Sequence, residues 1–420
     1  MHSVNALLLS RWFPTALQVL FVVTMVALSY LGLQPIRRAE TNPATAAIWT
    51  VWWPLLPFTV LFLGRLWCAL CPAGALGDWV QRLFPTSRSM APTWVQKTGA
   101  WFALVGIGAT GLAFLALALE SNGPLTVVLL SMISMGAVLL ALPYRGRVWC
   151  RWFCPLGIML GLYSRLSLIE VRAGRVGYKP AVGQSCPQFT SAVSHLRHRD
   201  CILCGVCVKE AEEAVAVQPS WWFRKGLRVP SLTLVEALTV SLLFGLLAVD
   251  SLRMTPLYLE YMTWALPVTD NYRLALTLGG LALMAMILSA QIALATLGGG
   301  DFGAQRLFRE QSLILIPLAF ALHLALSAQH LLAGSPGVLQ GMAVELGLLS
   351  SGHLPPDSAY FVNFPLKVFQ VLLLALGVAG MVYLDGRRQS GLNGWRQPLT
   401  RTAPAAMVAL IFLQPMSAVC

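Results

Sequence analysis

One stretch of this chain reads Gly64-Arg65-Leu66-Trp67-Cys68-Ala69-Leu70-Cys71-Pro72-Ala73-Gly74, and it recurs 82 residues later as Gly146-Arg147-Val148-Trp149-Cys150-Arg151-Trp152-Phe153-Cys154-Pro155-Leu156-Gly157. Both copies keep a Gly-Arg-x-Trp-Cys frame and a Cys-Pro-x-Gly end, and an apolar hairpin of two predicted helices precedes each copy. The repeating unit is therefore two helices plus a cysteine loop, used twice in the same orientation. Two equivalent loops on one face can bring four thiolates together.

The composition places these loops in a membrane protein. Of the 420 residues, 57% are hydrophobic and only 11% are charged, and the mean hydropathy is +0.70, values that a soluble chain of this length rarely reaches. A run of roughly 17 to 25 apolar residues is long enough to cross the hydrocarbon core of a membrane. Such runs lie at 13–34, 47–64, 98–119, 124–143, 232–250, 274–298, 311–333, 367–384 and 403–418. We predict an all-α polytopic membrane protein with about nine transmembrane helices.

The net charge of +12 indicates membrane topology and not a nucleic-acid partner. Lys and Arg gather in the cytoplasmic loops of membrane proteins. With the N-terminus inside, 24 of the 29 Lys and Arg residues fall on inner segments and five on outer ones. This bias predicts the orientation of a multi-pass protein, which we expect in the bacterial cytoplasmic (inner) membrane. The N-terminus and the eight clustered cysteines are then expected on the cytoplasmic side.

Eight of the nine cysteines lie in three spaced groups between residues 68 and 207. Thiols at such short spacings in a reducing compartment are metal ligands far more often than disulfide partners. Four plus four thiolates is the ligand count of two cubane iron–sulfur clusters. We therefore predict two 4Fe-4S clusters. The expected ligands are Cys68, Cys71, Cys150 and Cys154 for the first cluster and Cys186, Cys201, Cys204 and Cys207 for the second.

The second set of cysteines has most of a ferredoxin loop. The run from Cys201 through Cys204 to Cys207 has the spacing of the first three ligands of a bacterial ferredoxin, but the usual Cys-Pro three residues later is absent. Cys186, which precedes Pro187, is the obvious substitute. An exchange of ligands between the two sets stays open, because the Cys-Pro cysteine of two-cluster ferredoxins serves the other cluster. A tetrahedral thiolate site for zinc is the alternative for the two cysteine pairs of the repeat, whereas three cysteines at two-residue gaps are less typical of zinc.

Three regions follow from this organisation. Residues 1–165 form the duplicated two-helix membrane unit with its Cys-x2-Cys-Pro and Cys-x3-Cys-Pro loops. Residues 166–230 are the only long polar stretch, and we predict a small ferredoxin-like cytoplasmic domain there. Residues 231–420 form a C-terminal transmembrane bundle to which the sequence assigns no role.

The duplicated frame and the ferredoxin-like cysteines resemble the membrane-bound polyferredoxin family typified by NapH, NosR and CcoG proteins, over about residues 10–230. The resemblance implies clusters at the cytoplasmic face of the membrane. Relatives of this kind pass electrons from quinol or cytoplasmic donors toward periplasmic oxidoreductases, or assist the maturation of metalloenzymes. Three features depart from the family: a Cys-x2-Cys first pair in place of Cys-x3-Cys, a single three-cysteine run where many relatives have two loops, and about five added spans after residue 230.

The histidines suggest where a membrane cofactor would bind. His323 lies near the middle of the 311–333 run, and His330 follows seven residues later on the same helical face. Ionisable side chains inside a bilayer are candidates for function. A structural role between helices is the first interpretation of His323 and His330, and contact with a quinone head group is the functional alternative. Haem is disfavoured, because it takes histidines from different helices and no other apolar run supplies one.

These observations predict a membrane-bound iron–sulfur electron-transfer protein, a component or subunit of an oxidoreductase to which no catalytic residue is assigned. Electrons would pass between a soluble cytoplasmic redox protein and a quinone or a partner subunit in the membrane. Basic residues of the polar stretch would steer an acidic partner; they are Arg197, Arg199, Lys209, Arg224 and Lys225. The alternatives are a reductase that assists metal-centre maturation of another enzyme and a non-redox zinc-binding membrane scaffold.

Overall fold

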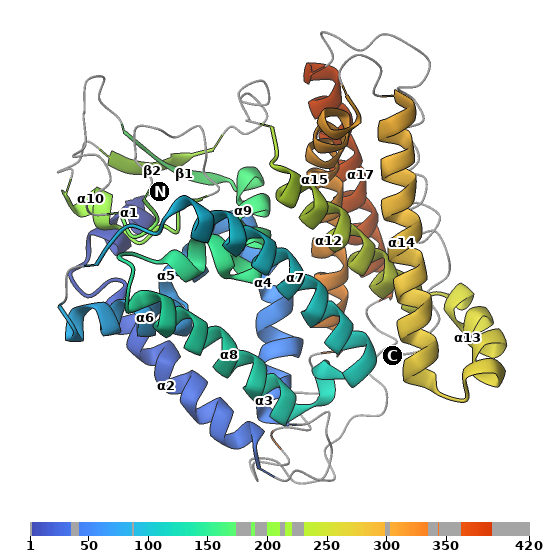
Figure 1. The fold of residues 1–420 in the computed structure, drawn as a ribbon, viewed down its shortest axis with the longest axis horizontal. Helices are drawn as coiled ribbons and strands as arrows, with labels where there is room; N and C mark the ends of the chain where they lie inside the picture. Colours follow the sequence, from blue (N-terminus) through green and yellow to red (C-terminus); the bar gives the residue numbers. More distant parts are fainter. Residues whose placement is uncertain are drawn as a thin grey trace. The chain divides into compact units, whose positions relative to one another are not determined.

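The structure is a computed structural model that describes residues 2–34, 42–85, 88–173, 186–189, 200–210, 215–220, 231–298, 303–334, 343 and 363–388. Within these ranges the chain is mostly helical (Figure 1). The longer helices are α2 (Thr15–Gly32), α4 (Trp53–Leu63), α6 (Pro72–Leu83), α7 (Thr93–Leu117), α8 (Gly123–Ala141), α12 (Leu234–Arg253), α13 (Pro256–Thr269), α14 (Tyr272–Gly298), α15 (Ala304–Gln329) and α17 (Asn363–Arg388). The shorter elements are α1 (His2–Leu9), α3 (Pro43–Thr45), η2 (Ala46–Trp52), α5 (Leu66–Leu70), η3 (Leu119–Ser121), η4 (Trp149–Phe153), α9 (Pro155–Tyr163), η5 (Ser164–Leu166), α10 (Val206–Glu210), η8 (His330–Gly334), β1 (Ile169–Ala173) and β2 (Val215–Pro219).

Eight helices in the described ranges are long and apolar enough to cross a membrane, consistent with a multi-pass membrane protein. They coincide with the first eight apolar runs of the sequence. The second is built from α3, η2 and α4, which follow one another without a break over Pro43–Leu63. The ninth predicted run, 403–418, lies outside the described residues. The total of nine helices and the side of the membrane that each end faces therefore stay predictions.

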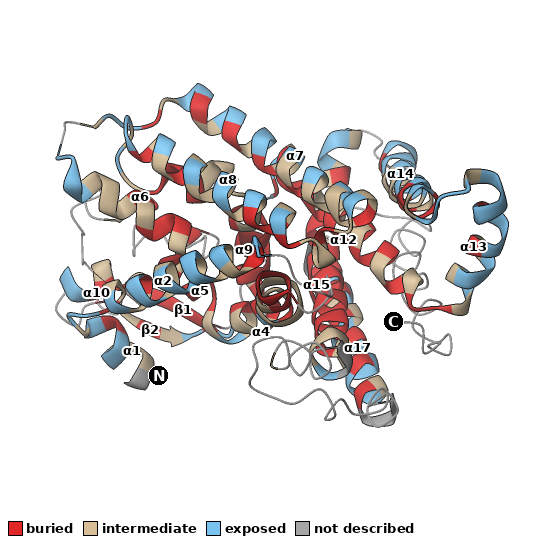
Figure 2. Ribbon diagram, turned by 90° about the horizontal axis from the view of Figure 1, so that it is seen from below, coloured by how far each residue is buried: buried red, intermediate tan, exposed pale blue. Residues whose placement is uncertain are grey.

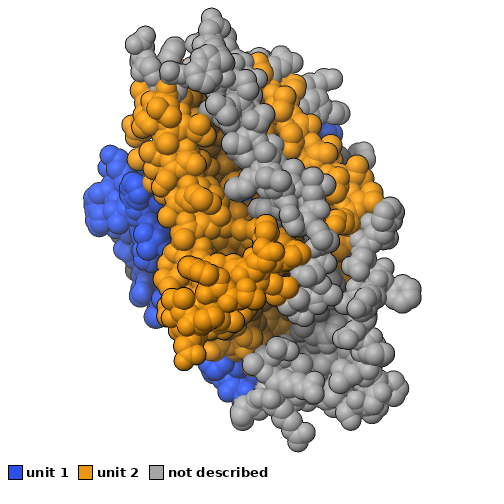
Figure 3. All heavy atoms as spheres, turned by 90° about the vertical axis from the view of Figure 1, so that its right-hand side faces the viewer, with its two compact units in different colours: residues 1–34, 56–106, 124–230 blue, residues 35–55, 107–123, 231–420 orange. Residues whose placement is uncertain are grey.

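The chain divides into two compact units, which Figure 3 shows in different colours. The first unit comprises residues 1–34, 56–106 and 124–230 and contains all eight clustered cysteines. The second unit comprises residues 35–55, 107–123 and 231–420 and contains His323 and His330. The predicted boundaries at 165 and 230 stay predictions.

In the first unit, a two-stranded antiparallel sheet is the only strand structure among the described residues. Strand β1 pairs with β2 from Ile169 opposite Pro219 to Ala173 opposite Val215. Strand β1 follows α9 and η5, and just before its start the Leu168 N–H donates to the Leu61 carbonyl at 2.8 Å. The sheet thereby joins the cysteine-rich segment to the end of α4.

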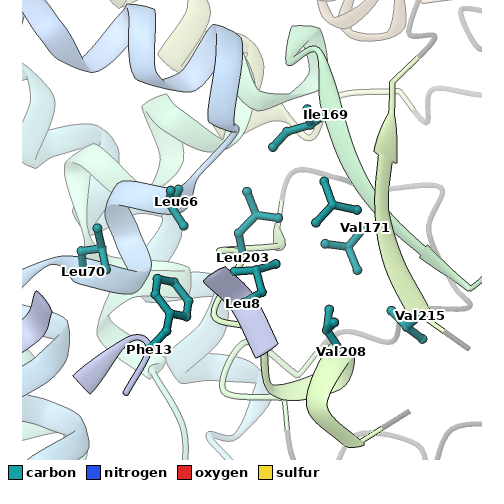
Figure 4. Close-up of a cluster of buried hydrophobic side chains, with 10 residues drawn as sticks. Leu8, Phe13, Leu66, Leu70, Ile169, Val171, Leu203, Val208 and Val215 are labelled. Carbon is teal, nitrogen blue, oxygen red and sulfur yellow. The ribbon is translucent and has the colours of Figure 1, made fainter. Parts of the chain in front are cut away.

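The N-terminal helix α1 packs against that same segment. Leu8 is fully buried, and Figure 4 shows it among Phe13, Leu66, Leu203 and Val208 in one hydrophobic cluster. These side chains come from the N-terminal segment, the first cysteine loop and the ferredoxin-like run, so three distant parts of the sequence share one core. Burial of apolar side chains is the main stabilising term for such a cluster.

The second unit is built around α15. Of the most apolar stretch of this helix, 89% of the residues are buried inside the structure, and Figure 2 shows α15 as buried along most of its length. Helices α12, α14 and α17 pack against it. The contact with α17 is close at Gly377, where an added Cβ would lie 2.6 Å from the Cβ of Ala321. Helix α12 begins with a capping box, in which Glu236 and Thr233 bond each other's backbone N–H groups.

The segment 251–273, which the sequence indicates as a connecting loop, contains the additional helix α13. The helix begins with Pro256 at its first position, where a backbone N–H would have no helical partner and proline is therefore tolerated. It ends at Asp270, whose backbone is left-handed. The side chains of Tyr261 and Met262 pack on residues of α12 and α14. Helix α13 has 14 residues, fewer than the roughly 17 that a membrane span needs, so this segment is not among the predicted apolar runs.

Candidate metal centre

Each cysteine loop begins at the glycine of the repeated frame. Gly64 and Gly146 have φ angles of 56° and 71°, in the left-handed region that other residues avoid. At Gly146 an added Cβ would also lie 2.6 Å from the ring of Phe189 and 2.9 Å from the carbonyl oxygen of Pro187. Glycine is thus required at the same point of both copies, where the chain turns into the cysteine pair.

The turn between the two cysteines differs by one residue between the copies, and its helix type differs accordingly. Cys68 lies in the α-helical turn α5, whereas Cys150 lies in the π-helical turn η4. In η4 the Cys154 N–H donates to the carbonyl of Trp149, five residues earlier, at 2.8 Å. A π turn closes over one more residue than an α turn. The extra residue of the Cys-x3-Cys pair is therefore accommodated inside the turn.

The second cysteine of each pair is the N-cap of the next helix. Cys71 precedes α6 and Cys154 precedes α9 with nearly the same backbone, at φ and ψ of −53° and 128° for the first and −72° and 120° for the second. The proline that follows suits the first helical position, where an N–H has no helical partner. Neither sulfur forms a capping hydrogen bond of good geometry. Burial raises the pKa of both thiols, and the N–H groups of Gly74 and Gly157 partly oppose that rise.

The structure gathers the four cysteines of the repeat loops. Cys150 is buried, and Cys71 and Cys154 pack against the same small core. Burial, followed by the neighbouring sulfurs of Cys71 and Cys68, raises the pKa of Cys154 to about 12. Burial raises the pKa of Cys150 as well, and the guanidinium of Arg147 opposes that rise. The shared core places Cys71, Cys150 and Cys154 together, and Cys68 of the first loop affects the pKa of Cys150 and Cys154.

Cys186 is held on the second repeat loop. The N–H of Arg147 donates to the carbonyl of Pro187 at 2.8 Å. The ring of Phe189 stacks on Trp152 with centroids 5.8 Å apart and an angle of 19° between the planes. A backbone bond and a ring contact therefore fix the short segment that carries Cys186 beside the loop of the first set.

The ferredoxin-like run is fixed to the same loop at its start. Arg151, between the two cysteines of the second copy, forms an ion pair with Asp200 at 3.4 Å. At the far end of the run, Lys209 donates to the carbonyl of Phe13 at 2.6 Å. Gly205, with φ of 79°, lies so close to the Leu8 carbonyl that an added Cβ would be 2.7 Å from its oxygen. Residues from both neighbouring segments thus hold this run in place.

The four cysteines of the second set line one hollow of about 460 Å³, a volume that includes space open to solvent. Burial, followed by the Cys186 sulfur and opposed by the Val206 N–H, raises the pKa of Cys204 to about 11. Burial, followed by the sulfurs of Cys204 and Cys186, raises the pKa of Cys207 to about 12. Cys186, the predicted substitute for the missing ferredoxin ligand, therefore lies with the other three.

Two buried arginines lie among the cysteines. Arg147 and Arg65 occupy the same position of the repeat, and their exposed fractions are 5% and 2%. Arg147 forms a bidentate ion pair with Asp78, with Nη2 2.6 Å and Nε 3.1 Å from the carboxylate oxygens. It also donates to the carbonyls of Cys68 and, at 3.4 Å, Ala69. The arginine of the second copy thus crosses into the loop of the first.

These arginines interact with both sets of cysteines. Burial lowers the pKa of Arg147, but Asp78 and then the sulfurs of Cys150 and Cys204 outweigh that effect, so its pKa is raised. Burial likewise disfavours the charge on Arg65, and the Cys68 sulfur, to which Arg65 donates a hydrogen bond, raises its pKa above the ordinary value. Both guanidinium groups therefore stay charged in the interior.

The residues present fit two 4Fe-4S clusters. Each set supplies four thiols, which is the ligand number of a cubane. The N–H groups that face the sulfurs and the buried cations suit a group with net negative charge. In the described ranges, no group of three or more His, Cys, Asp or Glu side chains is arranged to hold a single metal ion. Ligation by each named cysteine stays a prediction.

The two predicted quinone contacts lie in the second unit. His323 is 4% exposed, and its ring lies 5.8 Å from that of Trp53. His330 does not share this packing: its Nε2 lies 3.3 Å from the Oδ2 of Asp250 at the end of α12. Asp250 is a partner that the sequence did not indicate, although an acidic residue at the end of an apolar run is a signal for such a site.

Several residues that the sequence singles out lie outside the described residues. They are most of the basic residues expected to steer a partner: Arg197, Arg199, Arg224 and Lys225. Lys209 is described, and it bonds the N-terminal segment. Conversely, Asp78, the partner of Arg147, gave no sequence signal, because the corresponding position of the second copy is Gly161.

Comparison with known families finds a 4Fe-4S binding domain that matches residues 45–90 and 127–175. The two matched segments contain the two copies of the repeat with their four cysteines, which supports an iron–sulfur protein. Searches of curated proteins and of solved structures found no match to the chain. The more specific resemblance to NapH, NosR and CcoG proteins stays a prediction.

Proposed function

We propose that this chain relays electrons through two 4Fe-4S clusters, between a cytoplasmic redox partner and a quinone or partner oxidoreductase subunit in the membrane. The observation that supports the proposal is that Cys71, Cys150 and Cys154 pack at one core, whereas Cys186, Cys201, Cys204 and Cys207 line one hollow of the same unit. The 4Fe-4S domain match over both repeat loops and the eight apolar helices support it. A bound cluster supplies one-electron storage, and the protein sets its potential through burial, N–H groups and charge.

The cytoplasmic placement of the clusters rests on the distribution of Lys and Arg along the chain. A cysteine-substituted variant labelled from each side of the membrane tests it. A cysteine introduced at exposed Arg82, on α6 directly after the first loop, should be labelled only from the cytoplasmic side. Labelling only from the opposite side would overturn the orientation.

Metal analysis tests the cofactor. Anaerobically purified full-length protein should contain about eight irons and about eight acid-labile sulfides per chain, and reduction should give a low-temperature paramagnetic signal. Zinc without sulfide would reject the proposal in favour of a scaffold. A reductase for metal-centre maturation would hold the same clusters and would in addition reduce a free metal ion in an assay with the purified protein.

Paired substitutions test the division into two sets. Cys71→Ser should remove about half of the iron and Cys204→Ser the other half, because each residue lies in a different set. The two remaining halves should differ in their paramagnetic signals. Loss of all iron in both variants, with the protein still folded, would contradict two independent ligand sets.

The quinone part of the proposal is supported by the polar side chains of the second unit. His323 of α15 lies buried against Trp53, and His330, in the π turn that follows α15, pairs with Asp250 of α12. Such groups can hydrogen-bond a quinone head. Protein with both clusters intact should have them reduced by a short-chain quinol, and His323→Phe should abolish that reduction while dithionite still reduces both. Full quinol reduction in this variant would reject His323 as a contact.

A further inference from the structure

The two arginines of the repeated frame have a position that ligand binding alone does not require. Arg65 and Arg147 precede the first cysteine of each pair, Cys68 and Cys150, by three residues, and neither arginine is an expected cluster ligand. Yet at both places an arginine is buried almost completely, although burying a guanidinium is costly without negative partners. The negative partners that the structure provides are sulfurs and carboxylates of the candidate centre.

Resting on the proposed function, we propose that Arg65 and Arg147 are positioning residues that set the reduction potentials of the two clusters. A cluster with four thiolates is negatively charged, and reduction adds one more negative charge. A fixed cation nearby stabilises the reduced form more than the oxidised form. The potential therefore rises when an arginine is close and falls when its charge is removed.

Arg147 acts on both clusters. Its guanidinium interacts with the sulfur of Cys150 in the first set and with that of Cys204 in the second. Its backbone N–H holds the segment of Cys186, and its side chain binds the Cys68 carbonyl. Arg147 thus contacts the first set through its side chain and the second through its backbone, and removal of its charge should change both potentials in the same direction.

Arg65 acts mainly on the first cluster. The sulfurs with which it interacts, Cys68 and Cys150, both belong to the repeat loops. Its acidic neighbour, Asp200, directly precedes the ferredoxin-like run and also pairs with Arg151. The two arginines, equivalent in the repeat, are therefore not equivalent in effect.

Asp78 limits the effect of Arg147. Its carboxylate binds the guanidinium in a bidentate manner, and it also interacts unfavourably with a Cys204 thiolate. The Asp78→Asn change keeps the size of the side chain and removes the negative charge. Both cluster potentials should then rise, which is opposite to the effect of removing the charge of Arg147.

The experiment is a redox titration of full-length, anaerobically purified protein, followed by the paramagnetic signals of both clusters, with iron and sulfide measured in parallel. Arg147→Gln should lower both potentials, Asp78→Asn should raise both, and Arg65→Gln should lower mainly that of the first cluster. Arg82→Gln is the matched control, because Arg82 is exposed on the same helix as Asp78 and water screens its charge. It should leave both potentials unchanged.

Opposite shifts distinguish this role from a structural one, since loss of packing would not change the potential in two directions. If Arg147→Gln fails to hold its clusters, Asp78→Asn alone decides. Potentials of the iron-loaded Asp78→Asn protein that are unchanged or lowered overturn the inference. Absence of iron and sulfide from the unmodified protein would instead overturn the proposed function, which is a distinguishable result.

Discussion

Replacement of Gly157 by alanine is the sharpest test of the loop geometry. Gly157 is the third residue of α9, and an added Cβ would lie 2.4 Å from the carbonyl oxygen of Cys150 and 3.2 Å from the Cβ of Cys154. The first neighbour is backbone and cannot rotate away. The two cysteines of the second loop must therefore move apart from their present arrangement.

The magnitude follows from two opposing terms. Alanine in place of glycine in a helix gains about 1 kcal/mol, and overpacking of a tight site costs typically about 1–3 kcal/mol. Because the added Cβ clashes with main chain, the overpacking cost should lie near the upper end of this range. The net loss in free energy of unfolding is then about 1–2 kcal/mol. Such a loss changes an equilibrium by a factor of about 5–30, enough to displace the loop in a substantial fraction of molecules.

The assay is the iron and sulfide content together with the thermal midpoint in detergent. Gly157→Ala should lose about half of the iron, that of the first set, and should melt at a lower temperature. Gly386→Ala is the control, because an added Cβ there meets no atom within 4 Å. It should keep all of its iron. Full iron content and an unchanged midpoint in Gly157→Ala would refute the reasoning about this loop.

Three further changes test other parts of the first unit. Asn5→Ala removes the side-chain oxygen that accepts a hydrogen bond from the Val217 N–H at 2.9 Å, at a cost of about 1 kcal/mol. The Val217 amide hydrogen should then exchange with solvent roughly fivefold faster. An unchanged exchange rate would contradict the contact. Gly146→Ala costs about 1–2 kcal/mol for its positive φ and displaces Phe189, so the iron of the second set should fall, whereas retention of all iron would count against this support. An alanine inserted after Ala69 should preserve the iron, since the second loop holds the same number of residues; loss of the first cluster would show that the two turns are not interchangeable.

The sequence predicts the features that repeat or follow a strict period. The first eight apolar runs coincide with eight helices that can cross a membrane. The 82-residue repeat indicates two loops of one design, and in the structure each has a glycine at positive φ and an N-cap cysteine followed by proline. Cys186, which the sequence offers as the missing ligand because proline follows it, lines one hollow with the ferredoxin-like run.

Contacts between distant segments could not be predicted in this way. Asp78 of α6 forms an ion pair with Arg147, but the second copy of the repeat has Gly161 at the position of Asp78. A comparison of the two copies therefore does not single out Asp78. Helix α1 is short and has no membrane-length run, and only the structure shows Leu8 in the core beneath the cysteine segment. These contacts depend on how loops fold back on one another, for which the sequence carries no local signal.

The π turn of the second loop has a consequence for how such proteins evolve and are recognised. Because one residue can enter or leave the turn between Cys150 and Cys154 while the second cysteine still caps its helix, insertion and deletion are local events here. Natural selection can therefore change the number of residues between two ligands without rebuilding the fold around them. A search for relatives should fix the glycine, the cap and the proline, and should leave the number of intervening residues free.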